Sequence, residues 1–128
     1  MGAERYKERK QELLTAVQRL DDACAQPFSS FIRDSVIRRF EFCWELAWKT
    51  LRLRLEADGI IANTPREAWQ QALQAGLIAD GNAWSEAQKM RNLTTHTYDE
   101  KLADEVYQFV LRAGLPLFRD LAGKVTQW

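Results

Sequence analysis

The sequence has few of the residues that break helices and few reactive side chains. It contains six glycines, three prolines, two cysteines and one histidine in 128 residues. Leucine, alanine, glutamine and long charged residues, which favour helices, are frequent instead. No run approaches the ~20 apolar residues that cross a bilayer, and the polar start carries no apolar stretch typical of a signal peptide. We therefore expect an all-α, cytoplasmic protein.

The balance of charge and the absent motifs exclude several functional classes. Lys+Arg and Asp+Glu both total 18, so the chain has no surplus of positive charge for holding nucleic acid on a broad basic face. A brief contact with RNA at a small site is still compatible with this balance. Cys24 and Cys43 lie in helical apolar patterns without metal-ligand spacing. With no glycine-rich phosphate loop and one histidine, we expect neither a cofactor nor a metal site.

The length fits a single domain, 1–128, and the hydrophobic periodicity predicts five helical segments. They run from about 4 to 25, from about 31 to 57, from 65 to a stop at 76, from 82 through 90, and from about 98 to 125. Segments of these lengths with short connections favour a four-helix up-and-down bundle with one extra short helix.

Several helix ends carry recognisable signals. Thr64 and Glu67 form a capping box, in which the threonine hydroxyl accepts a backbone N–H and the glutamate reaches back. The other expected signals are a C-terminal cap at Gly59, an N-cap at Asn82, a second capping box at Thr97 and Glu100, and a kink at Gly114 and Pro116.

The second segment is apolar on two sides, which a surface helix is not. Beside its core face runs a further strip that carries Phe42, Cys43, Leu46, Thr50 and Leu53. Such a helix either lies at the centre of its own bundle or is shared with a second chain. Because few helices are available to cover it, we favour a two-fold symmetric homodimer with Phe42, Leu46 and Leu53 at the interface.

The side chains that could take part in catalysis are concentrated between Arg91 and Glu100. On a continuous helix, Arg91 and His96 would point apart, but the helical pattern fades after Met90 and a new capping signal follows. A helix end here can bring the guanidinium and the imidazole toward one pocket. Histidine titrates near neutrality and suits proton transfer, while the planar arginine fork matches a phosphate.

The same residues also permit a structural interpretation. His96 would then cap a helix end, Arg91 would pair with a nearby carboxylate, and Tyr98 would be a half-buried aromatic. Spacing alone favours this interpretation, because a lone histidine rarely identifies an enzyme.

The string Arg-Asn-x-x-x-His-x-Tyr that begins at Arg91 resembles the signature of the HEPN superfamily (higher eukaryotes and prokaryotes nucleotide-binding). More narrowly, the chain resembles the nucleotidyltransferase substrate-binding proteins, small bacterial partners of minimal nucleotidyltransferases. The likeness covers most of the chain, through residues 40–51, 65–67, 75–78, 91–100 and 115–118. The short motif alone is weakly specific, whereas the ordered set is quite specific.

This resemblance implies a four-helix core, a homodimer and a partner encoded beside it. In toxins of this type, the arginine and the histidine, here Arg91 and His96, form a metal-independent ribonuclease site at the dimer interface. The tyrosine at the place of Tyr98 is adenylylated by the partner nucleotidyltransferase, which acts as the antitoxin. Asn92 and Thr95 belong to the same motif and are assigned supporting roles.

The resulting hypothesis is a toxin-like endoribonuclease from a two-gene toxin–antitoxin module, with RNA as its substrate. The alternative is a non-catalytic subunit that presents a substrate, or its own Tyr98, to a nucleotidyltransferase; the neutral overall charge mildly favours it. A third interpretation is that the protein is a helical scaffold in which the Arg–His pair has a structural role.

Overall fold

The structure is a computed structural model that describes residues 2–128. Within that range every regular element is helical, which confirms the all-α prediction. The elements are α1 (Gly2–Cys24), α2 (Ser30–Ala57), α3 (Pro65–Gln74), α4 (Gly81–Leu93), the 3₁₀ turn η1 (Thr94–His96), α5 (Glu100–Phe109), the π-helical segment η2 (Val110–Gly114) and α6 (Leu115–Val125). No helix in residues 2–128 is both long and apolar enough to span a membrane.

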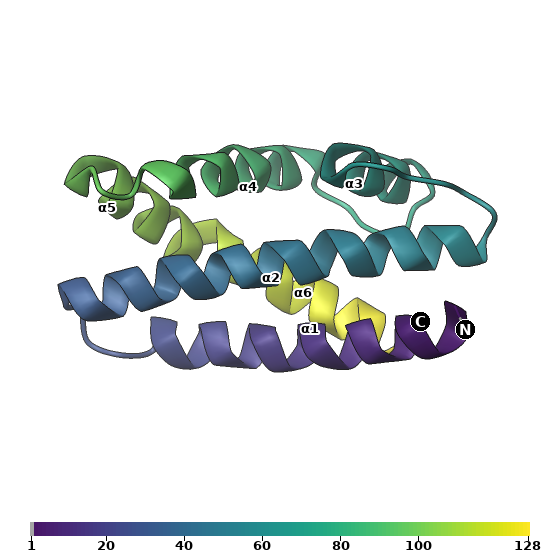
Figure 1. Ribbon diagram of the computed structural model, residues 1–128, viewed down its shortest axis with the longest axis horizontal. Coiled ribbons are helices and arrows are strands. Elements are labelled where there is room, and N and C mark those ends of the chain that lie inside the picture. The colour runs from purple at the N-terminus through teal and green to yellow at the C-terminus, as the bar shows by residue number, and fades with distance from the viewer. Residues whose placement is uncertain (1) are drawn as a thin grey trace.

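The long helices alternate in direction, as an up-and-down bundle requires. α1 and α2 lie antiparallel, α3 and α4 follow one another on the other side of α2, and α5, η2 and α6 form one rod that crosses back diagonally (Figure 1). α3 is the extra short helix. The chain ends beside its start, where Lys10 Nζ donates a hydrogen bond of 2.9 Å to the carbonyl of Trp128.

α2 is enclosed by helices of its own chain. It contacts α1 on one side and α3, α4, α5 and α6 on the others. Of the strip that we expected at a subunit interface, four residues are buried within the single chain, namely Cys43, Leu46, Thr50 and Leu53. The helix is therefore apolar on two sides because it is central in its own bundle. Leu46 and Leu53, at 5% and 6% exposure, offer almost no area to a second chain, so their prediction as interface residues is wrong.

An aromatic cluster ties α2 to the helices that cover it. Phe40 and Trp44 of α2 meet Phe118 of α6 and Trp84 of α4, with ring centroids 5.7 Å and 6.0 Å apart respectively. The Trp84 and Phe118 rings lie 6.4 Å apart. All four side chains are buried. Because each such ring buries roughly 150–250 Å², the cluster joins three helices in one core.

The threonine half of the capping box predicted for α3 is confirmed. The Thr64 hydroxyl accepts a hydrogen bond from the Glu67 backbone N–H at 3.1 Å, whereas the Glu67 carboxylate reaches past Thr64 and accepts one from the Asn63 N–H at 2.7 Å. The first contact satisfies a donor that the first turn of a helix leaves unpaired, and the second joins the residue before the cap to that turn.

Two other predicted caps are wrong. α4 begins at Gly81, so Asn82 lies inside its first turn and cannot be the N-cap. The N-cap is Asp80, which adopts a left-handed φ of 63° and whose carboxylate accepts a hydrogen bond from the Ala83 backbone N–H. α5 is capped by Asp99, whose carboxylate accepts two N–H groups of the first turn. The Thr97 hydroxyl donates to an earlier carbonyl instead, and Glu100 forms an ion pair.

The C-terminal rod changes its winding where Gly114 and Pro116 predict an interruption. Pro116 lacks the N–H that would bond one turn back, and the five residues of η2, which end at Gly114, are π-helical. A Cβ added at Gly114 would lie 3.1 Å from the Phe109 ring, so the glycine permits the close approach of the aromatic core.

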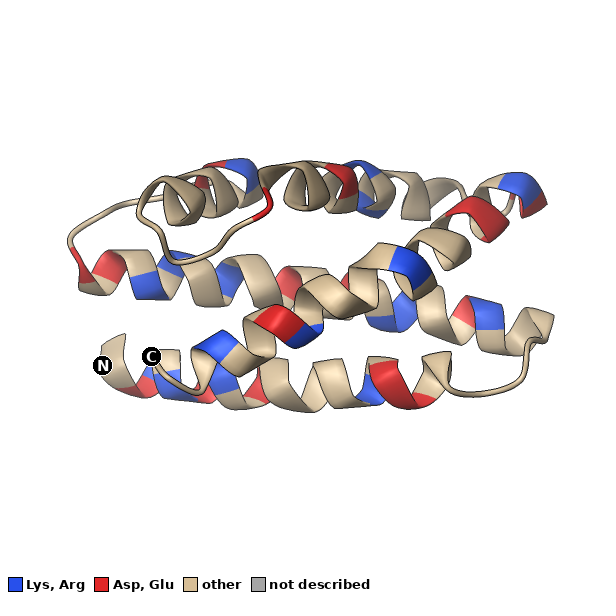
Figure 2. Ribbon diagram, turned by 180° about the vertical axis from the view of Figure 1, so that it is seen from behind, with Lys and Arg blue, Asp and Glu red and all other residues tan. Residues whose placement is uncertain are grey.

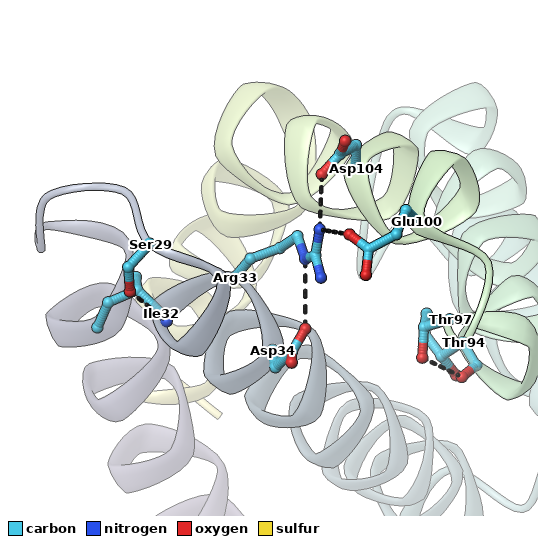
Figure 3. A network of polar contacts seen from close by, with 8 residues as sticks. All are labelled: Ser29, Ile32, Arg33, Asp34, Thr94, Thr97, Glu100 and Asp104. Atoms are coloured by element: carbon cyan, nitrogen blue, oxygen red, sulfur yellow. Dashed lines mark hydrogen bonds and ion pairs between the residues drawn. The ribbon is translucent and has the colours of Figure 1, made fainter.

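A buried arginine joins the first turns of α2 and α5 (Figure 3). Arg33 Nη1 donates to Glu100 at 2.6 Å and to Asp104 at 3.1 Å, while its Nε donates to Asp34 at 3.3 Å. Glu100 and Asp104 are one turn apart on α5, so both carboxylates reach the same guanidinium. This contact, called the Arg33 clamp below, fixes the start of α5 directly after residues 94–99.

We expect Arg33→Met to destabilise the fold less than the double variant Glu100→Gln/Asp104→Asn. The first change removes the buried charge and leaves exposed carboxylates that water can solvate, at a cost of about 1 kcal/mol. The second leaves a buried guanidinium with Asp34 alone, at a cost of about 3 kcal/mol. Urea unfolding followed by circular dichroism measures both, and equal losses or the reverse order would contradict this account of the clamp.

Candidate functional site

The segment between α4 and α5 is a helix end closed by threonine hydroxyls. Thr94, Thr95 and Thr97 each donate to the carbonyl three residues earlier, at 2.7, 3.1 and 3.2 Å. These bonds pair carbonyl groups where the regular α-helical pattern ends. The chain then makes the 3₁₀ turn η1 and a short turn before Asp99 begins α5. The predicted interruption of the helix after Met90 is confirmed, with α4 ending at Leu93.

This turn brings His96 and Tyr98 together. The His96 Nδ1 lies 3.2 Å from the Tyr98 hydroxyl, and the two rings meet edge to face with centroids 5.9 Å apart. Both side chains are exposed, Tyr98 by 81%, so the expectation of a half-buried tyrosine in the structural interpretation is wrong. The pair presents an imidazole nitrogen and a phenolic hydroxyl to any partner that approaches.

Arg91 lies on α4 and points toward α2. Its Nη1 donates to the Thr94 hydroxyl at 3.3 Å, and its Nη2 lies 3.6 Å from Glu45 Oε1. The pairing with a carboxylate agrees with the structural interpretation. Its Nε, however, is buried without a hydrogen-bond partner among the described residues, and an unpaired buried donor calls for an explanation.

Two neighbouring cavities open along the polar side of α2. The larger, called the groove below, has a volume of about 680 Å³ and is bounded by residues of α1, α2 and α4. Its lining includes Arg19, Arg38, Arg39, Glu41, Phe42, Glu45 and Arg91. The smaller, called the cleft, measures about 230 Å³ and is lined by Asp34, Ile37, Arg38, Glu41, Thr97 and Tyr98.

The predicted site residues are thus only partly assembled within one chain. His96 contacts Tyr98, and Tyr98 lines the cleft, whereas Arg91 lines the groove. The described residues include no hydrogen bond between Arg91 and His96. Asn92 and Thr95 are exposed, and the Thr95 hydroxyl bonds to the Asn92 carbonyl rather than to the His96 ring.

Of the three predicted interface residues, Phe42 alone remains available. It is 58% exposed and lines the groove beside Arg38 and Arg39. Its exposed ring is apolar surface whose burial by a partner or ligand would be favourable.

The two cysteines stay outside this site. Burial, the larger cause, and the negative charge of the nearby Asp21 carboxylate together raise the pKa of Cys24 to about 11. Burial raises the pKa of Cys43 to about 12. Both thiols are therefore protonated at neutral pH, and a protonated thiol is a weak nucleophile.

Charge is distributed without one dominant sign. Basic and acidic positions are interspersed along the helices in Figure 2, in agreement with the neutral total. Within residues 2–128, no group of three or more His, Cys, Asp or Glu side chains is arranged to hold a metal ion. Local positive charge is instead supplied by the arginines of the groove.

Two arginines near the site, one structural and one that lines the cavities, were not identified from the sequence. Arg33 recurs with Val36, Ile37 and Phe40 on a buried face of α2, and a charged residue in such a pattern predicts a buried ion pair. This signal was available and was missed. Arg38 lines both cavities, but its place beside Tyr98 depends on the packing of α2 against a segment far along the chain, which no local pattern encodes.

Comparison with known proteins gives a consistent result. A family described as nucleotidyltransferase substrate binding protein like matches residues 7–127. The chain is also similar to the probable ribonuclease HepT of Haemophilus influenzae, with 36% identity over 89 residues that cover 61% of this chain and 60% of that protein. The match thus spans less than two thirds of that relative.

Two solved structures share the fold. One, from Thermus thermophilus, is 28% identical with a TM-score of 0.81 and covers 88% of this chain and 98% of that one. The other, from Haemophilus influenzae, is described as the fold of a substrate binding domain of a nucleotidyltransferase; it is 27% identical with a TM-score of 0.69 and covers 97% of this chain and 98% of that one. The chain therefore belongs to the nucleotidyltransferase substrate-binding protein family, the narrower HEPN group that its sequence resembles.

Proposed function

We propose that the protein is a metal-independent endoribonuclease that acts as a homodimer and is silenced by adenylylation of Tyr98. The contact between His96 Nδ1 and the Tyr98 hydroxyl carries this proposal, because a nucleotide attached to that hydroxyl would lie against the only histidine of the chain. The proposal extends to a two-gene toxin–antitoxin module in which a minimal nucleotidyltransferase is the antitoxin.

The cleavage chemistry needs more groups than one chain supplies. An RNA 2′-hydroxyl attacks the adjacent phosphorus, the bond to the 5′-oxygen breaks, and a 2′,3′-cyclic phosphate and a free 5′-hydroxyl result. This reaction uses a base, an acid and positive charge on the phosphate. A two-fold dimer supplies two copies of His96 as base and acid and two copies of Arg91 for the charge.

The silencing step is a transfer of a nucleotidyl group. The Tyr98 hydroxyl attacks the α-phosphorus of ATP that the partner enzyme holds, a Tyr–O–P bond forms, pyrophosphate leaves and the phenolic proton passes to solvent. With 81% of its surface exposed, Tyr98 is open to such an enzyme. The added phosphate and nucleotide would then block His96 by charge and by volume.

The relatives support both parts of the proposal. The similar protein of Haemophilus influenzae bears the name probable ribonuclease, and the family description and one solved relative refer to nucleotidyltransferases. The Arg91 side chain is 26% exposed and lines the groove, so part of its guanidinium is accessible to a phosphate oxygen there.

A second function is a non-catalytic subunit that presents a substrate to a nucleotidyltransferase. The description of the solved relative as a substrate binding domain favours it, as does the engagement of Arg91 by Glu45 at 3.6 Å. Nuclease assays separate the two functions.

We expect the purified chain to cleave labelled RNA in the presence of EDTA and His96→Ala to lower kcat by about 10²–10⁴-fold, the usual contribution of general acid–base catalysis. His96 is exposed, so its removal leaves the core intact. Lys101→Ala, also exposed and close in sequence, serves as the control and should retain activity. No cleavage by a folded, unmodified wild-type chain would favour the non-catalytic subunit.

Tyr98→Phe should retain nuclease activity but resist silencing. Co-incubation with the minimal nucleotidyltransferase of the same genome and ATP should add adenylyl groups to the wild-type chain and abolish cleavage. Mass spectrometry and the RNA assay measure the two effects in parallel. Equal nuclease rates for modified and unmodified dimers would contradict the proposed silencing.

Phe42→Glu should weaken the dimer. It removes an apolar contact from both copies and places two carboxylates in the interface, which together should raise the dissociation constant about 100-fold or more. Analytical ultracentrifugation measures the change. Phe31→Glu, at another exposed phenylalanine of α2, is the matched control, and an unchanged dimer for both variants would move the interface elsewhere.

A further inference from the structure

Arg38 and Glu41 stand where the two cavities adjoin. Both residues line the groove, and both line the cleft. Tyr98 borders the cleft and Arg91 borders the groove, so the polar side of α2 between Arg38 and Glu41 connects the tyrosine with the arginine. A group that is attached to the Tyr98 hydroxyl and extends toward Arg91 would pass over these two side chains.

The guanidinium of Arg38 is free to bind a ligand, unlike those of its neighbours. Arg33 is held by three carboxylates, and Arg39 Nη1 donates to the carbonyl of Arg19 at 2.6 Å. Arg38 is exposed and forms no hydrogen bond or ion pair among residues 2–128. Its planar fork of N–H donors matches the oxygens of a phosphate.

The carboxylates of the cleft are compatible with a bound nucleotide, because one is neutralised by an arginine and the other can accept hydrogen bonds from the ribose. Asp34 is already engaged by Arg33 at 3.3 Å, which offsets its negative charge. Glu41 lies three residues after Arg38 and has no partner among the described residues, so it can accept hydrogen bonds from ribose hydroxyls. Without Arg38, these carboxylates would repel a phosphate placed in the cleft.

We propose that Arg38 binds the phosphate of a nucleotide attached to Tyr98 and holds the modified tyrosine in the cleft, with Glu41 accepting from the ribose. This inference rests on the proposed modification of Tyr98 and adds the residues that retain the modified side chain. When Arg38 binds the phosphate, the modified Tyr98 is held in place and blocks access to the groove. Silencing therefore depends on Arg38 as well as on the volume of the added nucleotide.

The test introduces phosphotyrosine at position 98 by genetic encoding, which supplies the phosphate without a partner enzyme. The ³¹P resonance is followed against pH in three chains: one otherwise wild type, one with Arg38→Gln and one with Arg39→Gln. The second ionisation of a phosphorylated side chain has a pKa of about 6. A cation beside the phosphate lowers that value, and we expect Arg38→Gln to raise it by at least about half a unit.

Arg39→Gln is the matched control, because the Arg39 guanidinium is already bound to a carbonyl and should leave the phosphate titration unchanged. His96 is present in all three chains, so the difference isolates Arg38. Identical titrations in the wild-type and Arg38→Gln chains would overturn the proposal. Identical titrations combined with weaker RNA binding by Arg38→Gln would overturn it too and would assign Arg38 to the RNA.

This readout is independent of nuclease activity. If the unmodified wild-type chain cleaves no RNA but the phosphate titration responds to Arg38→Gln, the phosphate site stands and the ribonuclease is refuted. If cleavage is found, adenylylated Arg38→Gln should recover about tenfold more activity than adenylylated wild type, as expected for the loss of a charge-assisted hydrogen bond.

Discussion

The rest of the structure depends on the burial of α2, whose apolar surface is too wide for one neighbouring helix to cover. α1 covers one side, and the helices that follow α2 cover the others, joined through the aromatic cluster. The strip left in contact with water is mainly polar but includes the exposed Phe42, and part of it, from Arg38 to Glu45, lines the groove. The candidate site therefore lies on the side of α2 that the other helices of the chain leave uncovered.

The same packing decides which residues near the site are held and which are accessible. Thr94 is buried against the end of α4, and the Arg33 clamp holds the first turn of α5. Between these two fixed points, His96 and Tyr98 are exposed on a short turn. The scaffold thus fixes the two ends of the segment and leaves its side chains accessible, an arrangement often found where function resides on loops.

Local sequence signals predicted the local structure well. They failed for features that depend on packing between residues far apart in the chain. The capping box at Thr64 and the interruption near Gly114 depend on neighbouring residues, and both were predicted. The choice between Asp80 and Asn82 depends on a left-handed loop residue that composition does not reveal. The covering of Leu46 depends on helices far along the chain. The His96–Tyr98 contact depends on a 3₁₀ turn, because side chains two residues apart on an α-helix do not face each other.

The π-helical segment has a consequence for how this chain can vary in length. A π-bulge accommodates one more residue than the α-helix it interrupts, so α6 is rotated by about 100° relative to a regular continuation of α5. Because the bulge absorbs that extra residue, removing one residue between Val110 and Gly114 would restore a regular helix and keep the buried face of α6, with Phe118 and Leu121, directed at the core. Regular winding of the present sequence would instead turn that face away. A single deletion should therefore be tolerated in this segment, whereas a second deletion would rotate α6 by about 100°.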